Sequence, residues 1–249
     1  MHSTVIFQAS VFGDYLSIIP TLEVMNLLAN VPTELEITLL PSTTNVVNLN
    51  TFIQEGGTAP PTAVQRINMV DTNQRWSITI LPERIDVSFN QQNIEDEEAF
   101  ETIASKASVL LRKTINDLSV NFYRMAVNCT TQFENKNDCS TTALFDMLIK
   151  PMHHQIGRES IEWQVVSNCP REITLDSNHK ELLNVISAVA WQVNPVTVRP
   201  AITAQFDVNT DAQNLMQRFS CDKLGTFCTT AVGMTSDFIR DIEEKMINV

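Results

Sequence analysis

Glycine is scarce in this chain, which has only six glycines among 249 residues. They are Gly13, Gly56, Gly57, Gly157, Gly225 and Gly233. No arrangement of them gives a dinucleotide-binding fingerprint, a phosphate-binding loop or a nucleophile elbow. Those sites need glycine because the backbone must approach a phosphate closely or turn sharply beneath a serine. The standard versions of these enzyme classes are therefore disfavoured.

Long apolar runs and a secretion signal are also missing. No stretch of about 18 apolar residues occurs, and the amino terminus MHSTVIFQAS has no basic region followed by an apolar segment. The five cysteines are odd in number and form no Cys-x-x-Cys pair, so they predict reduced thiols instead of a disulfide framework. We therefore expect a cytoplasmic protein that does not enter a membrane.

Basic residues are few. There are 17 lysines and arginines against 29 acidic residues, a formal net charge of -12. Such a field repels phosphate backbones and anionic lipid headgroups, so binding of nucleic acid or of a membrane surface is disfavoured. A basic protein partner, or mimicry of a nucleic-acid backbone, fits the sign of the charge better, and so does the simpler role of keeping the protein soluble.

Alternating apolar residues mark one hairpin. Period-two alternation over 75–80 and again over 84–89, with Pro82 and Glu83 between, predicts two half-buried strands joined by a turn. After Asn93 the apolar period changes to three and four, which predicts an amphipathic helix of roughly 24 residues. Asn93 is the expected N-cap, and Glu95, Asp96, Glu97 and Glu98 are expected in the first turn, where the helix dipole favours acids.

The same order of elements occurs again near the carboxyl terminus, with strands expected over 182–193 and 199–208 and a helix over 226–247. The expected fold is α+β, with antiparallel sheets covered by long amphipathic helices in two repeated strand-strand-helix units. We expect an N-terminal half over 1–135 and a C-terminal half over 136–249, or one domain that includes both. Further strands are expected over 4–12, 35–41, 120–133 and 159–167, helices over 21–30 and 141–150, and a loop over 55–65.

Residues 207–211 resemble the start of a calcium loop, with oxygen-bearing side chains at alternate positions. That loop would need glycine and glutamate where Ala212 and Arg218 stand, so the EF-hand interpretation fails. A strand end followed by a helix, capped by Asn209, Thr210 or Asp211, is expected instead.

Candidate reactive groups are scattered. His153 and His154 could join Cys139 and Cys169 in a zinc site, although no spacing favours this over two solvated imidazoles. Cys169 could act with His179 as nucleophile and base, or be an inert thiol. A metal site could also form from Glu83, Asp86, Asp207 and Asp211, which fall near expected strand ends. The metal candidates are thus Asp207, Asp211, His153 and His154, and the sequence indicates neither a catalytic residue nor a cofactor.

Several segments together resemble a known family. They are the run WSITILPERIDVSFN, the long helix after it, the strand ending RMAVN, and AITAQFDVNT before a terminal helix ending DFIRDIEEKM. In this combination, over roughly residues 5–247, the chain resembles a sporadically distributed family of uncharacterised bacterial proteins. The resemblance implies an α+β fold and a bacterial or phage context, with no established activity and no catalytic residues.

The sequence thus leaves two functions open. The first is a non-enzymatic, acidic cytoplasmic protein that acts by protein-protein interaction, as an accessory, immunity-like or anti-defence factor, with a protein partner or by self-association as a homo-oligomer. The alternative is a metal-dependent enzyme whose carboxylate site is assembled from distant segments.

Overall fold

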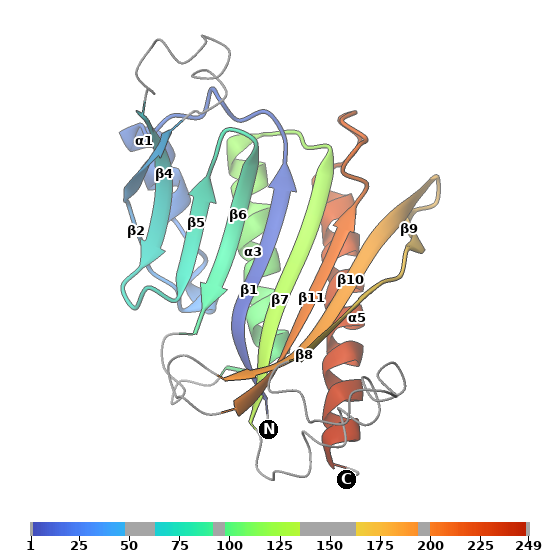
Figure 1. The fold of residues 1–249 in the computed structure, drawn as a ribbon. Coiled ribbons are helices and arrows are strands. Elements are labelled where there is room, and N and C mark those ends of the chain that lie inside the picture. Colours follow the sequence, from blue (N-terminus) through green and yellow to red (C-terminus); the bar gives the residue numbers. More distant parts are fainter. Residues whose placement is uncertain (1, 48–62, 92–97, 135–162, 194–199, 248–249) are drawn as a thin grey trace, which may run out of the picture.

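The computed structural model describes residues 2–47, 63–91, 98–134, 163–193 and 200–247. One antiparallel sheet of eleven strands has long helices on one face (Figure 1). The strands are β1 (His2–Phe12), β2 (Leu39–Leu40), β3 (Thr43–Val47), β4 (Ala63–Asp71), β5 (Trp76–Ile80), β6 (Arg84–Asn90), β7 (Arg124–Glu134), β8 (Trp163–Asn168), β9 (Arg171–Asp176), β10 (His179–Val193) and β11 (Pro200–Thr210). The helices are α1 (Leu22–Ala29), the short 3₁₀ helix η1 (Thr33–Leu35), α3 (Phe100–Leu118) and α5 (Cys221–Ile247).

The strand order is β2-β4-β5-β6-β1-β7-β11-β10-β8, with β3 paired to β4 and β9 to β10. β1 and β7 lie in the middle, where Gln8 faces Asn128. β7 also pairs with β11, so one sheet contains strands from both of the predicted halves. The order β5, β6, α3 on one side of this central pair matches β10, β11, α5 on the other. The α+β class with an antiparallel sheet and long helices is confirmed, whereas a duplication of the two halves stays a prediction.

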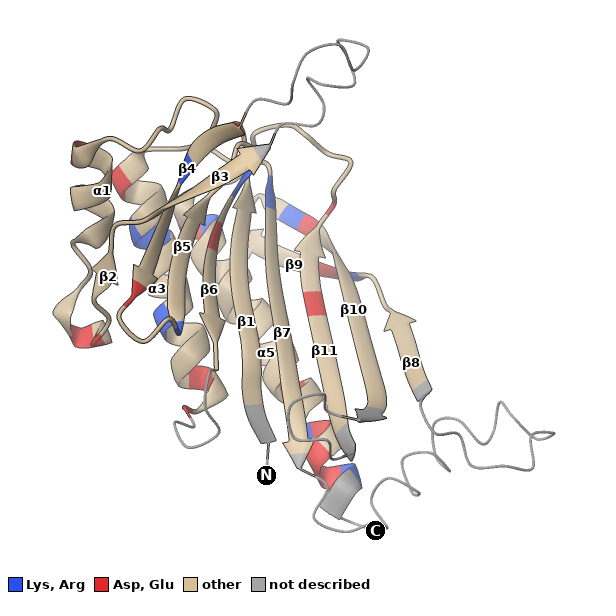
Figure 2. Ribbon diagram, turned by 60° about the vertical axis from the view of Figure 1, so that its left-hand side comes forward, with Lys and Arg blue, Asp and Glu red and all other residues tan. Residues whose placement is uncertain are grey.

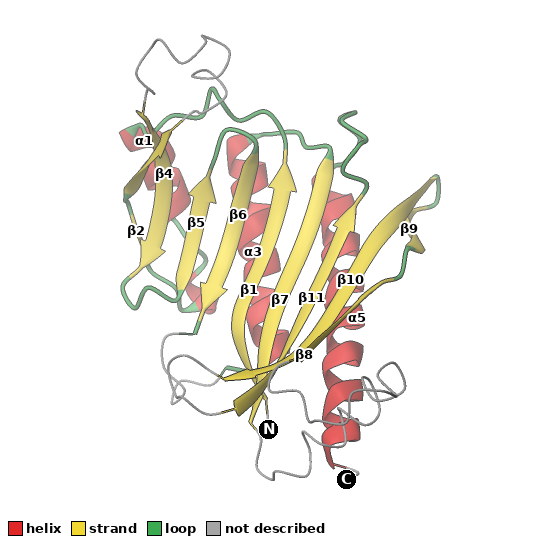
Figure 3. Ribbon diagram, viewed as in Figure 1, coloured by secondary structure: helices red, strands yellow, loops and turns green. Residues whose placement is uncertain are grey.

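The core lies between the sheet and the two long helices (Figure 3). On the hairpin, the alternation places Trp76, Ile78 and Ile80 on the helix side of β5, opposite Phe89, Val87 and Ile85 of β6. α3 packs on β1 and β6, and α5 packs on β7, β11 and β9. The predicted apolar stripe of α3 is buried against them, including Phe100, Ile103 and Leu111.

The start of α3 corrects one prediction. The helix begins at Phe100, and the residue before it, Ala99, makes no side-chain capping hydrogen bond. Asn93 and residues 95–97 lie outside the described residues. Glu98 precedes the helix and forms ion pairs with Arg75 at 3.3 Å and with Lys106 at 2.7 Å. This acid therefore links the turn before β5 to α3 instead of occupying the first helical turn.

Other observed element boundaries differ from the predicted ones, because tertiary packing can override the local sequence pattern. The strand expected over 35–41 is reduced to Leu39–Leu40, since η1 occupies Thr33–Leu35. β4 begins at Ala63, inside the loop expected over 55–65, and β3 and β9 were not predicted. The helix expected over 141–150 lies outside the described residues. Within the described ranges, no helix is both long enough and apolar enough to span a membrane.

Candidate functional site

Among the described residues, the predicted metal ligands do not come together in one group. Asp207 lies on β11, on the sheet face opposite the long helices, where it accepts a hydrogen bond of 3.1 Å from the side chain of Asn209. Burial raises the pKa of Asp207, although Asn209 and the charge of Arg124 act in the opposite direction. In Figure 2 the middle of the sheet is largely tan, because its central strands contain few charged residues. His153 and His154 lie outside the described residues.

Asp211 shows why the predicted helix cap is wrong. Its carboxylate accepts a hydrogen bond of 2.9 Å from the backbone N–H of Gln213, two residues on, which is an Asx-turn. The segment after β11 then continues as turns and bends until α5 begins at Cys221. Neither Asn209 nor Thr210 caps a helix, and the Thr210 hydroxyl instead accepts from the backbone N–H of Met125 at 3.0 Å.

The carboxylate of Asp86 already has a hydrogen-bond partner and an ion-pair partner. Its carboxylate accepts a hydrogen bond of 2.7 Å from the Ser10 hydroxyl and pairs with Arg84 at 2.9 Å, and burial raises its pKa. β1 and β7 separate β6 from β11, so the Asp86 and Asp207 backbones lie about 14 Å apart at ordinary strand spacing. Among the described residues, no group of three or more histidine, cysteine or acidic side chains could hold a metal ion.

The thiols do not form the predicted nucleophile and base pair. The backbone N–H of Cys169 bonds to Val185 of β10, six positions along that strand from His179. At strand rise this is about 20 Å. Cys129 and Cys228 are buried, and burial raises the pKa of each to about 12, so both stay protonated near neutral pH. Cys129 is thus a buried thiol as predicted, whereas Cys169 is exposed.

Sequence reasoning missed a partly buried polar cluster around His179, in which Glu181 is the buried member. Lys223 Nζ lies 2.9 Å from His179 Nδ1, and an ammonium can only donate, so Nδ1 accepts. The His179 Nε2–H then donates to Glu181 at 3.0 Å, and Arg218 donates to the same carboxylate at 2.9 Å. The His179 ring also stacks on Phe219 at 5.6 Å between centroids.

This cluster fastens the segment before α5 to the sheet. Arg218 Nη1 donates to the carbonyl of Tyr123 at 2.6 Å and of Asn214 at 2.7 Å. Burial raises the pKa of Glu181, but hydrogen bonds from Arg218 and His179 outweigh burial and hold the pKa below its usual value. The polar side chains of this cluster therefore hydrogen-bond to one another. Residue spacing could not predict this cluster, because Arg218 and Lys223 are distant in sequence from His179 and Glu181.

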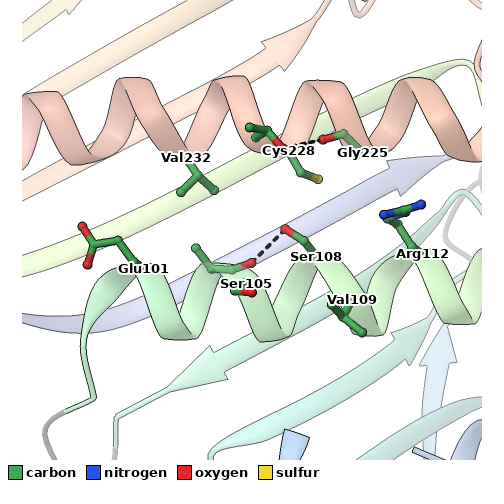
Figure 4. Close-up of a pocket in the computed structure, with 10 residues that line it drawn as sticks. Glu101, Ser105, Ser108, Val109, Arg112, Gly225, Cys228 and Val232 are labelled. Carbon is green, nitrogen blue, oxygen red and sulfur yellow. Dashed lines mark hydrogen bonds between the residues drawn. The ribbon is translucent and has the colours of Figure 1, made fainter. Parts of the chain in front are cut away.

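A groove of about 320 Å³ lies between α3 and α5 (Figure 4). Small side chains form most of its walls, with Glu101 near one end and Arg112 near the other. Its hydroxyls are used by their own helices, since Ser108 donates to the carbonyl of Ala104 at 2.8 Å. Thr229 likewise donates to Gly225 at 3.0 Å. The hydroxyls of Ser108 and Thr229 are thus engaged within their own helices.

The most unusual surface surrounds α1. Five of the eight residues of this helix, LEVMNLLA, are leucine, valine or methionine, yet only Leu28 is buried. Leu22 is 77% exposed and Leu27 is 38% exposed. A helix that is apolar on most of its sides is normally enclosed by protein. α1 instead presents part of this apolar surface to solvent.

The loop before α1 extends the exposed apolar area. In it Leu16 is 56% exposed and Ile19 is 53% exposed. We call Leu16, Ile19, Leu22 and Leu27 the α1 surface. Exposed apolar groups concentrated in one segment are typical of protein-interaction sites, whereas single exposed leucines are ordinary.

The fold holds this surface in place. The Thr21 hydroxyl accepts from the backbone N–H of Val24 at 3.3 Å and caps α1. Arg66 of β4 is 3% exposed and donates to the carbonyls of Leu16 and Ile18, both at 3.2 Å. Lys113 of α3 donates to the carbonyl of Leu27 at 3.1 Å. The exposed leucines are thus presented by an ordered helix and loop.

Comparison of the chain with models of known protein families and with curated proteins finds no match. The candidate site therefore depends on the geometry and chemistry of the α1 surface alone.

Proposed function

We propose that this chain is a non-enzymatic cytoplasmic protein that acts by binding another protein through the α1 surface. The observation that supports this most strongly is the exposure of Leu22 and Leu27 on a capped, anchored helix. Fully burying one leucine side chain is worth roughly 1.5–3 kcal/mol. Four large apolar side chains in one segment are therefore enough to supply the energetic centre of an interface.

A partner different from this chain fits better than a second copy. Each copy has a net charge of -12, so two copies repel one another at long range. A cytoplasmic location is supported by the thiols, since Cys129, Cys169, Cys221 and Cys228 are all free. An accessory, immunity-like or anti-defence role remains part of this proposal, because such factors act by binding.

A differential capture experiment tests the proposal. Wild-type protein, the double variant Leu22→Ser/Leu27→Ser and a control double variant are immobilised and exposed to lysate of the encoding organism. The control is Leu215→Ser/Met216→Ser, because these side chains are 66% and 75% exposed in the loop before α5.

We expect a stoichiometric protein that wild type and control retain and that the α1 variant loses. Capture that is equal on all three proteins would contradict the proposed surface. Loss on the control variant alone would move the interface to the loop before α5. Analytical ultracentrifugation of the wild type distinguishes self-association, because we expect a monomer when the partner is absent.

A further inference from the structure

The charge near the α1 surface differs from the charge of the rest of the chain. Residues 1–65 contain five acidic residues and no lysine or arginine, the first of which is Arg66. Residues 66–249 contain 24 acidic and 17 basic residues, so most of their acids can be balanced. The segment that presents the exposed leucines is therefore acidic without internal compensation.

Exposed acids occur in the same segment of the chain as the exposed apolar side chains. On α1, Glu23 lies one turn before Leu27 on the same side of the helix, and Asn26 lies one turn after Leu22. Glu23 thus lies between the two exposed leucines. Exposed acids also occur at Asp14, before Leu16, and at Glu34 and Glu36 in and after η1.

Among the described residues, Arg66 and Lys113 hydrogen-bond to this segment, and both side chains are occupied. Arg66 is buried and donates to the carbonyls of Leu16 and Ile18. Lys113 donates to the carbonyl of Leu27 and forms an ion pair with Asp117. Neither is available to neutralise Glu23, Glu34 or Glu36 across the surface.

From this arrangement we infer that the α1 surface binds a cationic amphipathic segment of its partner, with leucine-like side chains against Leu22 and Leu27 and lysine or arginine against the surrounding acids. This inference rests on the proposed function and specifies the chemistry of the partner. A neutral apolar partner would leave Glu23 beside the interface without an opposite charge, which weakens binding. A cationic partner would also be attracted at long range.

Three synthetic helical peptides of about four turns test the inference. All have the same leucine stripe, and their remaining positions are lysine, glutamine or glutamate. Fluorescence anisotropy measures their dissociation constants at low salt and at high salt. We expect the lysine peptide to bind wild type at least about tenfold more tightly than the glutamine peptide, and to weaken at high salt as the charges are screened.

Matched variants separate this site from the general negative charge of the protein. Glu23→Gln/Glu34→Gln/Glu36→Gln removes three charges around α1, and Glu83→Gln/Glu172→Gln/Asp241→Asn removes three exposed charges elsewhere. The first variant should weaken binding of the lysine peptide about tenfold, and the second should change it less than about twofold. Leu22→Ser/Leu27→Ser should weaken it as much as the first.

Equal weakening by both charge variants would show general electrostatic attraction and would overturn the inference. Binding of the glutamine peptide as tight as that of the lysine peptide, still lost in Leu22→Ser/Leu27→Ser, would overturn the cationic partner but leave the proposed binding surface intact. Binding of the lysine peptide that no α1 variant changes would overturn the inference, and the capture experiment would then decide the proposed function separately.

Discussion

α1 and α3 pack against each other, yet they differ in how many of their apolar residues are buried. α3 has 19 residues and buries eight of them in one stripe against the sheet. α1 has eight residues, mostly apolar, and buries one. The comparison shows that apolar content alone does not decide what a helix does. The apolar side chains of α3 stabilise the fold, whereas Leu22 of α1 is 77% exposed and Leu27 is 38% exposed.

The largest expected effect comes from truncating the stripe of α3. Leu111 is fully buried, so Leu111→Ala should lower the free energy of unfolding by about 2–5 kcal/mol through lost contacts and a cavity. Urea denaturation measures this loss. Binding of the partner by the folded fraction should not change. A loss of unfolding free energy below about 1 kcal/mol would contradict the contrast between α1 and α3, because α3 would then not be a core helix.

A slightly smaller loss of stability is expected when the ion pair between Glu181 and Arg218 is removed. Glu181→Gln leaves Arg218 without its carboxylate and should cost about 2–4 kcal/mol at neutral pH. The folded-state pKa of Glu181 is lowered, so its stabilising effect is full above the unfolded pKa of about 4.3 and is lost as pH falls through the folded pKa.

The difference in stability between wild type and Glu181→Gln should therefore shrink as the pH falls below about 4.3. Urea titrations at several pH values give this difference directly. A difference that is constant, or that grows in acid, would show that Arg218 does not stabilise the carboxylate.

The next largest effect on stability is expected for Arg66, which anchors the loop before α1. Arg66→Met removes the donor to the carbonyls of Leu16 and Ile18 and should cost about 1.5 kcal/mol. Hydrogen exchange over residues 14–29 should accelerate, while exchange in α3 should stay slow. Equal acceleration in both helices would mean that α1 and α3 unfold together, which would remove the distinction between them.

The cap of α1 should matter less. Thr21→Ala removes the acceptor for the backbone N–H of Val24 and should cost about 1 kcal/mol or less. The effect should be confined to exchange of α1 amides, and Thr21→Ser should restore slow exchange because serine keeps the hydroxyl. If Thr21→Ser behaved like alanine, the capping role of this hydroxyl would be wrong.

Much of the fold follows from local pattern. Period-two alternation predicted the β5–β6 hairpin, and periods of three and four predicted α3 and α5, because each element buries one face against a single layer. β4 was missed because its buried apolar residues, Ile67 and Met69, come only after three exposed residues, the charged Arg66 and a proline-rich stretch. The cap expected at Asp211 failed because an aspartate can close an Asx-turn as readily as begin a helix.

The candidate site could be predicted only in part. Sequence identified 21–30 as a helix and the protein as acidic, but it could not show that Leu22 and Leu27 stay exposed. Exposure depends on what packs over a helix, and here α3, β4 and β2 contact α1 while Leu28 is its buried residue. The cluster of His179, Glu181 and Arg218 was missed for a similar reason, since distant segments assemble it.

The most direct test is the free energy of unfolding of Leu22→Ser/Leu27→Ser, measured by urea denaturation beside wild type. If these leucines serve binding and not folding, the double variant should lose no more than about 1 kcal/mol, because Leu22 is 77% and Leu27 38% exposed and serine lowers helix propensity only slightly. A loss of about 2 kcal/mol or more would show that both side chains belong to the core and would contradict the account.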